Sequence, residues 1–502
     1  MRRAAALFIS IALALPAALT DAPPAVAAED FTFHGSGYGH GLGMGQYGML
    51  GLARAGWLPA KILRHYYTGT KVKKKPPPEK RIRVGLVQDD TEVKLRSVDG
   101  PYVFQLQNGK VIETVPDGKN RWVRVKDGKY KIEKPSGALV GGKLWGGKKT
   151  DLYAIPQDSR IWVADWGHHV MRGKVAFNII DDNHLDVVAD VPVQQYVFGV
   201  SEVPNTWHKM ALRTQAIASR TFAYWRLLGP RTGCSCDILS TTADQFYTGA
   251  DKETAFKGNR WVSAARKTKK KVVLHKGTPI YSVYGSSSGG HTEAIQNVWP
   301  AAAASPYLKG VCDPKDDVPE NPNTTWKATF TASAVTDALK PYTGGIGTVE
   351  SFKKYDRGVS GRVTTVKVVG SSGSKVVGGW NIRTALGLKD TRFYVNKNLN
   401  ITGQIRQKYD AIDCKPGKSM SKKVEVDGGR YQRFKKGRIY VNDGPGKVVW
   451  VRGKVLDTYL GEGGHNSGLG LPKKYLKIDG GTKGVFDGGK IVCTGGCTVT
   501  YD

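Results

Sequence analysis

Glycine occupies every second position from Gly35 to Gly45 within the stretch GSGYGHGLGMGQYG, residues 35–48. Such a stretch disfavours a regular helix or strand, because glycine loses more backbone entropy on folding than any other residue. It favours turns with positive φ and lets another group approach the backbone closely. We therefore expect a constrained loop, or, as the alternative, a tight structural turn in which the histidine is only packed. The side chains of this loop that can bind or stack on a ligand are His40, Gln46 and Tyr47.

A dinucleotide-binding loop is a second interpretation, because Gly43, Gly45 and Gly48 satisfy the formal pattern G-x-G-x-x-G. That motif requires a buried strand before the loop and an acidic residue about 20 positions after it to bind the ribose. Only FTF precedes the loop, and no acidic residue lies between Gly43 and Glu79. We therefore favour a loop that binds a sugar polymer or takes part in catalysis.

The size and composition of the chain predict a β-rich α+β fold with a few helices. It has 502 residues, of which 62 are glycine, and strand-like segments outnumber helical ones. Lysine and arginine exceed aspartate and glutamate by 75 to 43, a formal net charge of +32. A chain this basic is attracted to polyanions, which outside a cell are acidic wall polymers and lipid head groups rather than nucleic acid. A solvated basic surface is the alternative.

The N-terminal residues have the layout of a secretory signal peptide. Arg2 and Arg3 precede an apolar run that ends near Leu19, and the small residues of AVAAED follow. We expect a signal peptide over residues 1–28, with a retained N-terminal anchor as the alternative. The protein is thus expected to be exported.

The six cysteines are an even number, which favours disulfides in an exported protein. We predict that Cys493 and Cys497 are bonded, because the glycines between them allow the chain to fold back. A bond between Cys236 and Cys312 is a second expectation. Cys234 and Cys236 are too close in sequence to pair comfortably, and no further pair with zinc-binding spacing lies near them. We therefore expect neither a metal nor another cofactor.

Two helix patterns and a linker follow the glycine stretch. The first helix covers about residues 44–55 and ends at Gly56, and the second begins at Leu58-Pro59, with proline at the first helical position. The basic, proline-rich segment 71–81 (KVKKKPPPEKR) predicts a linker. Alternating runs separated by turn residues predict a β-rich subdomain over residues 82–190.

An acidic residue lies between two further helix patterns. DVPVQQYVFGV predicts a short helix with Pro192 near its start. In NTWHKMALRTQAIASRTFAYWRLL, side chains recur at steps of three and four from Trp207 to Trp225, which indicates a helix packed on a core. Glu202 lies between them in SEVP. A joint between two anchored helices suits a positioned catalytic carboxylate, and it suits an ordinary first-turn acid equally well.

The C-terminal region contains an internal echo. The pattern F-x-x-G-[RK]-I begins at Phe434 and again at Phe486. Two copies of one short β unit predict a separate, β-rich repeat module over residues 418–502.

Several of these segments resemble the sporulation stage II protein D / amidase-enhancer family (SpoIID/LytB). GYGHGLGMGQYGMLGLARAGWLPAKILRHYYTGT is similar to its glycine–histidine motif, and VPVQQYVFGVSEVPNTWHKMALRTQAIASRTFAY to its S-E-M-P segment and the helix after it. YGSSSGGHTEAIQNVW, PYLKGVCDPKD and WNIRTALGLKDTRF match further family stretches. The resemblance covers about residues 31–395 and implies a SpoIID-type domain over residues 29–412.

The resemblance also concerns chain order and the tail. The glycine–histidine motif lies late in the chain of many members and first in this one, which implies that the two ends of the domain meet in the fold. In the tail, GLGLP, RYQRFKKGRIYV and GVFDGGKIV resemble the LGFP repeats of actinobacterial wall proteins, which are thought to aid wall association.

The family resemblance implies a lytic transglycosylase that cleaves MurNAc–GlcNAc bonds of peptidoglycan glycan strands, with Glu202 as the acid. One carboxylic acid suffices, because the C6 hydroxyl of the sugar attacks in place of water. Gln215 and Arg220 match family positions, as supports of the site or as structural residues. Asp244 stands where some members have a cysteine that would bind zinc. The resulting candidates for substrate binding are His40, Gln46, Tyr47, Arg220 and Ser288.

We therefore expect a secreted, wall-associated enzyme. Its expected partners are peptidoglycan glycan strands, anionic wall polymers and a cell-wall amidase, with no nucleic acid among them. One alternative is a catalytically silent glycan binder that enhances a wall amidase. Another is a basic structural protein of the envelope. A link to sporulation, and whether the glycan must first lose its stem peptides, stay open.

Overall fold

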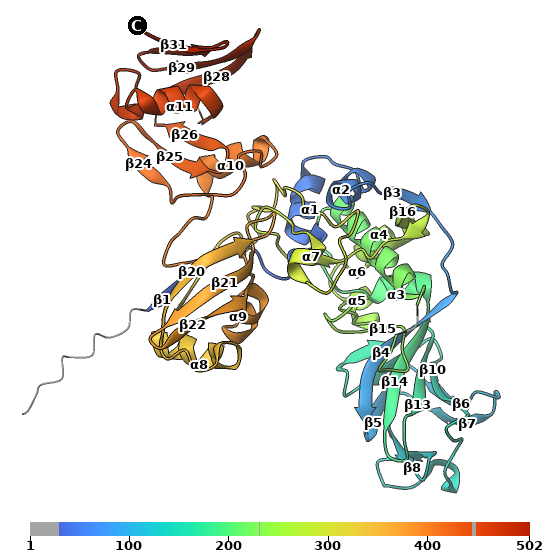
Figure 1. Cartoon of the computed structure of the whole chain (residues 1–502). Helices are drawn as coiled ribbons and strands as arrows, with labels where there is room; N and C mark the ends of the chain where they lie inside the picture. The colour runs from blue at the N-terminus through green and yellow to red at the C-terminus, as the bar shows by residue number, and fades with distance from the viewer. Residues whose placement is uncertain (1–29, 230, 444–447) are drawn as a thin grey trace, which may run out of the picture.

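The computed structural model describes residues 30–229, 231–443 and 448–502, so the expected signal peptide lies outside the described residues. These residues combine helices and strands in an α+β fold, as predicted. Within them, no helix is both long enough and apolar enough to cross a membrane. Figure 1 shows a helical body, an all-β arm that extends from it, a smaller α/β lobe beside it and a C-terminal region beyond the lobe.

The body is built around helix α4 (Lys209–Arg226), which packs against helices α1, α2, α3 and α6. Its predicted apolar residues are buried, and so is Arg220 on the opposite face, because these neighbours surround the helix. The remaining elements of the body are short: α5 (Ala250–Thr254), α6 (Gly258–Lys267), α7 (Ile295–Val298), β2 (Met44–Gly45), β16 (Lys271–His275), β17 (Thr278–Pro279) and β18 (Tyr284–Gly285).

Three predicted helices of the body are confirmed, each with its expected boundary residue. Helix α1 (Gln46–Arg54) is followed by Gly56 at a φ of 83°. Helix α2 (Pro59–Tyr66) begins at its proline, whose missing N–H costs nothing at that position, and buries Ile62, Leu63 and Tyr66. Helix α3 (Val193–Gly199) directly follows Pro192.

The alternating runs over residues 82–190 form the arm. One sheet has the order β15-β4-β14-β13-β10-β6-β7 and the other β12-β11-β5-β8-β9. The strands are β4 (Arg81–Asp90), β5 (Glu92–Val98), β6 (Tyr102–Leu106), β7 (Val111–Val115), β8 (Asn120–Lys126), β9 (Lys129–Glu133), β10 (Leu152–Pro156), β11 (Arg160–Val163), β12 (His168–Val170), β13 (Lys174–Ile179), β14 (Leu185–Pro192) and β15 (Ile238–Leu239), with the 3₁₀ turn η1 (Val140–Gly142). Because α3 starts where β14 ends, the arm is joined directly to the helix that precedes Glu202.

The prediction of a linker over residues 71–81 is wrong for its first four residues. Lys71–Lys74 forms strand β3, which pairs antiparallel with β16 some 200 residues later. The backbone partner comes from a distant segment, so the lysine-rich composition of residues 71–74 did not reveal the strand. Only residues 75–80 connect β3 to the arm.

The N-terminal strand β1 (Phe31–Gly35) belongs to the lobe. It lies between β19 (Trp326–Phe330) and β23 (Phe393–Val395) in a three-stranded antiparallel sheet. The two ends of the resembling region therefore meet, as the position of the glycine–histidine motif implied. The other elements of the lobe are α8 (Ala332–Thr343), β20 (Val349–Arg357), β21 (Val363–Gly370), β22 (Gly373–Gly378) and α9 (Gly379–Ala385).

The C-terminal region has two four-stranded sheets, and the two copies of the sequence echo form the same hairpin in each. Phe434 pairs with Gly437 and Phe486 with Gly489 at the turns. The elements are α10 (Gly403–Ala411), β24 (Val424–Val426), β25 (Gly429–Phe434), β26 (Gly437–Asn442), β27 (Val448–Val451), α11 (Gly453–Gly461), η2 (Gly464–Asn466), β28 (Pro472–Ile478), β29 (Gly481–Phe486), β30 (Gly489–Cys493) and β31 (Cys497–Tyr501).

The disulfides agree with one sequence prediction and contradict two. The predicted bond between Cys493 and Cys497 is confirmed. Cys236 is bonded to Cys234 and not to Cys312, because the turn between the two sulfurs holds their Cα atoms 5.2 Å apart, within the usual range. Cys312 is bonded to Cys414, which α10 brings to the body from 102 residues away.

Candidate functional site

The glycine loop of residues 35–48 lies against the protein itself over most of its length. A methyl group at Gly43 would overlap the carbonyl oxygen of Val283, and one at Gly48 would overlap the carboxylate of Asp313. Gly39 differs, because a methyl group there would meet no atom within 4 Å. The expected tight structural turn thus accounts for most of the glycines, and Gly39 alone of these three leaves its backbone open to a ligand.

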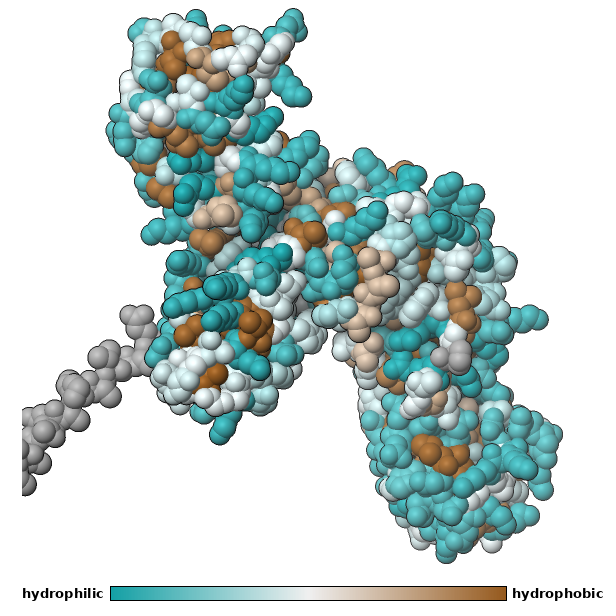
Figure 2. All heavy atoms as spheres, viewed as in Figure 1, coloured by the Kyte–Doolittle hydropathy of each residue, from teal (hydrophilic) through white to brown (hydrophobic). Residues whose placement is uncertain are grey.

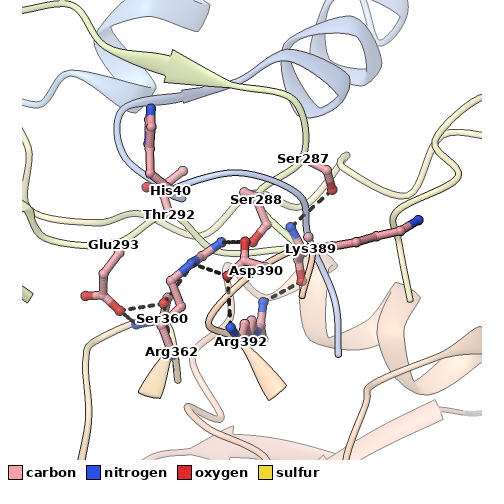
Figure 3. A network of polar contacts seen from close by, with 12 residues as sticks. His40, Ser287, Ser288, Thr292, Glu293, Ser360, Arg362, Lys389, Asp390 and Arg392 are labelled. Atoms are coloured by element: carbon pink, nitrogen blue, oxygen red, sulfur yellow. Dashed lines mark hydrogen bonds and ion pairs between the residues drawn. The ribbon is translucent and has the colours of Figure 1, made fainter. Parts of the chain in front are cut away.

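A buried polar network holds this loop in place (Figure 3). The guanidinium of Arg362 lies where a side chain at Gly41 would be, and it forms a bidentate ion pair with Asp390 at 2.8 and 2.9 Å. It also donates to the carbonyl oxygen of Ser288. His40 points away from this network in Figure 3. The network therefore fixes the backbone under His40 and leaves the imidazole available to the cavity above.

A cavity of about 500 Å³ opens beside the loop. Its walls come from the loop, from α1, α4 and α9, from the joint between α3 and α4, and from two segments near residues 242–244 and 281–286. The side chains that line it with polar or aromatic groups are Tyr38, His40, Gln46, Glu202, Phe222, Thr242, Asp244, Tyr281, Tyr284, Ser286, Trp299, Trp380 and Arg383. The structure thus brings His40, Gln46 and Glu202 together from segments about 160 residues apart.

Glu202 is held by backbone contacts between two loops. Val200 and Tyr247 form an antiparallel bridge, and the N–H of Ser201 donates to the carbonyl oxygen of Phe246 at 2.7 Å. The N–H of Phe246 in turn donates to Oε1 of Glu202 at 2.7 Å. From the other side, Nε2 of Gln46 donates to the carbonyl oxygen of Glu202 at 3.3 Å. The carboxyl group is therefore positioned by main-chain geometry rather than by a helix N-terminus.

Burial raises the pKa of Glu202 above its ordinary value of 4.5. Hydrogen bonds from the Phe246 N–H, the Gln46 amide and the Tyr284 hydroxyl, together with the charge of Lys252, act in the opposite direction without cancelling the effect. Such a carboxyl keeps its proton to a higher pH than an exposed glutamate does. This is the property that a general acid needs.

A chain of hydrogen bonds orients the hydroxyl of Tyr284. Tyr196 donates to Oε1 of Gln245 at 2.8 Å, and Nε2 of Gln245 donates to the Tyr284 oxygen at 2.6 Å. Because Tyr284 accepts from Gln245, its own proton can be donated to Glu202. The residues of this chain lie in YSVYG and ADQFY, where no local pattern marked them as functional.

His40 is a neutral donor in this environment. Burial and the charges of Arg362 and Arg383 lower the pKa of His40 to about 4. Its Nδ1 accepts a hydrogen bond from the N–H of Leu42 at 2.9 Å, so the proton of the neutral ring is on Nε2. The ring lies 5.6 Å from that of Trp299, which forms part of the cavity wall.

Among the described residues that line the cavity, the carboxyl groups are those of Glu202 and Asp244. Asp244 is fully buried and forms ion pairs with Arg226 and with Arg231, the latter at 2.6 Å. It also accepts from the N–H of Leu239 at 2.8 Å. Asp244 is therefore a structural anion, and Glu202 is the carboxyl of the cavity that is free to exchange a proton.

Three predicted binding residues do not line this cavity. Tyr47 packs on Trp207, with ring centroids 5.4 Å apart, beside the cavity rather than in it. Ser288 is buried and donates to Oδ2 of Asp313 at 2.8 Å.

Arg220 is fully buried on the far side of α4 and donates to the carbonyl oxygens of Ala265 and Thr268, both at 2.9 Å, at the end of α6. The assignments of Arg220 and Ser288 to substrate binding are therefore corrected to structural roles. Gln215 is likewise buried, and its amide donates to Ser219 at 3.2 Å.

The aromatic residues and the free cation of the cavity escaped the sequence reasoning. Trp380 and Arg383 come from α9, one helical turn apart, and the guanidinium lies 4.6 Å from the tryptophan ring centroid. Tyr281 and Trp299 line the opposite part of the wall. The signal that could have located α9 is the resembling stretch WNIRTALGLKDTRF, which contains both residues. Aromatic rings next to polar donors form a surface suited to sugar rings.

In the described part of the chain, the one group of potential metal ligands consists of Cys312, Asp410 and Cys414. The two sulfurs are joined in a disulfide, so neither is available as a thiolate ligand. This group also lies outside the cavity that contains Glu202.

Comparisons with known proteins agree with this geometry. Residues 181–275, which include Glu202, match the model of the SpoIID family, described as stage II sporulation protein, and residues 419–467 match the model of the LGFP repeat. An uncharacterised protein of Brachyspira hyodysenteriae is 28% identical over 205 residues, which cover 39% of this chain and 51% of the relative. Stage II sporulation protein D of Bacillus subtilis is 29% identical over 224 residues, 42% of this chain and 62% of the relative.

A third relative is the amidase enhancer of Bacillus subtilis, 35% identical over 120 residues, which are 23% of this chain and 14% of that protein. The chain thus spans about half to three fifths of the length of the first two relatives, and a small part of the third.

Proposed function

Because the chain carries a SpoIID domain and an LGFP repeat, we propose that it acts on cell-wall glycan as a lytic transglycosylase in which Glu202 is the acid. The observation that carries this proposal is a single exchangeable carboxyl with a raised pKa in a cavity of about 500 Å³. Glycosidases that use water generally need two carboxyl groups flanking the bond. A cavity with one is matched by an intramolecular reaction.

In the proposed reaction, Glu202 donates its proton to the glycosidic oxygen as the bond from C1 of MurNAc to that oxygen breaks. The carboxylate then accepts the proton of the C6 hydroxyl while O6 attacks C1 of the same sugar. The products are a 1,6-anhydro sugar end and a free 4-hydroxyl on the next sugar, and Glu202 is protonated again. No water is consumed, and one residue serves as acid and then as base.

The other residues of the cavity have binding and positioning roles in this proposal. Tyr284 donates to the Glu202 carboxylate after it loses its proton, which limits the cost of the buried charge. His40 presents its Nε2–H to a sugar hydroxyl or N-acetyl oxygen, and it stays neutral because its pKa is about 4. Trp380 and Arg383 offer a ring face and a cation to the same strand.

Replacement of Glu202 by glutamine tests the proposal. Glu202→Gln keeps the shape and loses the proton, so release of anhydro-muropeptides from purified peptidoglycan should fall by roughly 10²–10⁴-fold. The matched control is Glu320→Gln, which removes an exposed carboxyl paired with Arg54. Cleavage by the Glu202→Gln variant at the parent rate would show that Glu202 is not the acid.

The same variant should be more stable than the parent at pH 7. A buried carboxyl with a raised pKa binds its proton more tightly in the folded state, so the parent loses stability as pH rises from 4.5 through the folded pKa. Glutamine does not titrate, so the difference in melting temperature should shrink toward pH 4. This measurement separates a loss of chemistry from a loss of fold.

A second candidate function is a glycan-binding enhancer of a wall amidase, which the match to the amidase enhancer favours. It predicts faster digestion of peptidoglycan by a separate amidase and no anhydro products. The Glu202→Gln variant would then retain the enhancement. One muropeptide digest with and without an amidase distinguishes the two functions.

The C-terminal region is proposed to hold the protein on the wall outside the cell. The LGFP repeat and the net charge of +32 support this role. Deletion of residues 418–502 should reduce sedimentation with purified wall at both low and high salt. If deletion changes sedimentation only at low salt, basic charge provides the retention instead, because exposed charges are screened within about 8–10 Å at physiological salt.

A further inference from the structure

A second cavity, of about 560 Å³, lies on the other side of helix α4. Met210, Arg213 and Ile217 of α4 line it, whereas Phe222 of the same helix lines the cavity of Glu202. Five residues separate Ile217 from Phe222, which places the two side chains about 140° apart around the helix axis. The second cavity is therefore separate from the proposed active site, with the helix between them.

The rim of this cavity is basic. Five cations line it: Lys73, Lys74, Arg213, Lys267 and Lys271. No carboxylate is among the described residues that line it, and none of these cations forms an ion pair within the described part of the chain. Cations gathered without a counter-charge repel one another, so an anionic ligand would relieve that repulsion.

The floor of the same cavity is apolar. It consists of Leu58, Pro59, Ala60, Val72, Met210 and Ile217. Leu58 is 61% exposed, which is unusual for a leucine beside other apolar side chains. A polyanion without apolar groups would leave this floor uncovered. An occupant that carries both carboxylates and apolar side chains would cover it.

One side of the cavity is a sheet edge. Val72, Lys73 and Lys74 belong to β3, the last strand of the sheet β17-β16-β3 in the described chain. An edge strand offers backbone N–H and C=O groups to an extended peptide. Lysines on an edge discourage pairing with another basic or neutral strand. An acidic strand meets the opposite condition.

We propose that this cavity binds an extended acidic segment of a partner protein, which adds alongside β3 and places apolar side chains on the floor and carboxylates among the five cations. The unpaired cations, the apolar floor and the strand edge each match one feature of such a segment. Neither a phosphate polymer nor a lipid head group matches all three. The site does not depend on the reaction proposed for Glu202.

Binding of labelled peptides to the full chain tests this inference. The probe is a fluorescein-labelled peptide of sequence EVELEVE, and its comparators are ESESESE, inorganic polyphosphate and phosphatidylglycerol vesicles. Lys73→Glu with Lys267→Glu should weaken binding of EVELEVE about tenfold or more. The matched control is Lys126→Glu with Lys129→Glu, which makes the same charge change on the arm and should alter the dissociation constant less than twofold.

A further variant, Met210→Gln, should weaken EVELEVE and leave ESESESE unchanged, because it alters the floor only. Equal weakening by the two charge-reversal pairs would overturn the site, since net charge alone would then explain binding. Polyphosphate or vesicles that bind as tightly as EVELEVE, with the same loss in the rim variant, would overturn the peptide assignment. Release of anhydro-muropeptides serves as a separate readout, so failure here is distinguishable from failure at Glu202.

Discussion

At the scale of single residues, the chemistry of the proposed site depends on opposing effects on one carboxyl group. Burial raises the pKa of Glu202, while donors from Phe246, Gln46 and Tyr284 lower it. Burial acts on Lys252 as well and lowers the pKa of that ammonium group to about 8. The ammonium of Lys252 donates to the carbonyl oxygen of Val203 at 2.6 Å, next to the acid in sequence. The balance keeps Glu202 able both to give and to take a proton.

Tyr284→Phe should shift the pH dependence of glycan cleavage. The Tyr284 hydroxyl stabilises the Glu202 carboxylate, so its removal should raise the pKa of Glu202 further. The variant should then keep the acid protonated to a higher pH, and the alkaline limb of the pH–rate profile should move upward. The rate at the optimum should fall, because the carboxylate formed after proton donation is less stable.

Tyr281→Phe is the control, since it removes another hydroxyl of the same cavity that is not among the groups acting on Glu202. A limb that moves equally in both variants, or in neither, would contradict the assigned role of Tyr284.

At the scale of elements, helix α1 is packed so closely that its glycines serve contact rather than flexibility. Gly48 lies in this helix, directly over the carboxylate of Asp313. Asp313 is itself fixed by the hydroxyl groups of Tyr66 and Ser288, at 2.7 and 2.8 Å. A methyl group on Gly48 therefore has no flexible neighbour to displace.

Gly48→Ala should destabilise the protein although alanine is the better helix former by about 1 kcal/mol. Overlap with the held Asp313 carboxylate should outweigh that gain, with a net loss of roughly 1–3 kcal/mol in the free energy of unfolding. Gly461→Ala, in the last turn of α11, has open space around the new methyl group and should be neutral or slightly stabilising. Urea denaturation of both variants provides the comparison, and equal stability of the two would refute the close contact.

At the scale of the whole molecule, segments from opposite ends of the chain enclose the site. Strand β1 is paired between β19 and β23, and the lobe that they share supplies α9 with Trp380 and Arg383 to the cavity. On the visible face of the molecule, hydrophilic residues predominate and hydrophobic ones form small separate patches (Figure 2). The association of these parts is therefore maintained by local cores, strand pairing and the disulfide that joins Cys312 to Cys414.

Removal of the Cys312–Cys414 bond should cost more stability than removal of the Cys493–Cys497 bond. Loop-closure entropy grows with the number of residues enclosed, and the two bonds span 102 and 4 positions. On the chain-entropy account, the expected losses are roughly 5 and roughly 2 kcal/mol. Thermal unfolding of the two double cysteine-to-serine variants measures this order, and the reverse order would contradict it.

The Cys312–Cys414 bond also bears on the position of the C-terminal deletion. Ile405 and Tyr409 of α10 pack in one core with Phe434 and Ile439 of the repeat region. A chain that ends at residue 417 would expose these two side chains of α10. We therefore expect the truncated protein to melt at a lower temperature than the full chain, and its wall binding should be measured below that temperature.

The sequence by itself determined the parts of this protein whose information is local. Proline and glycine placed the boundaries of α1, α2 and α3, periodicity located α4, and the repeated turn pattern marked two equivalent hairpins. The candidates His40, Gln46 and Glu202 came from short motifs whose resemblance to a known family extends over their flanking residues. Such features depend on hydrogen bonds and burial within a few turns of chain, so a linear pattern records them.

Only the tertiary structure decided what each segment lies against. It turned Arg220 from a candidate ligand contact into a buried residue that joins α4 to the end of α6, and it paired Cys312 with Cys414. It showed that lysine-rich residues 71–74 form a strand, and it brought Tyr284 to Glu202. These outcomes depend on partners up to 200 residues away, and a side chain's burial, charge and pKa are set by those partners rather than by its neighbours in sequence.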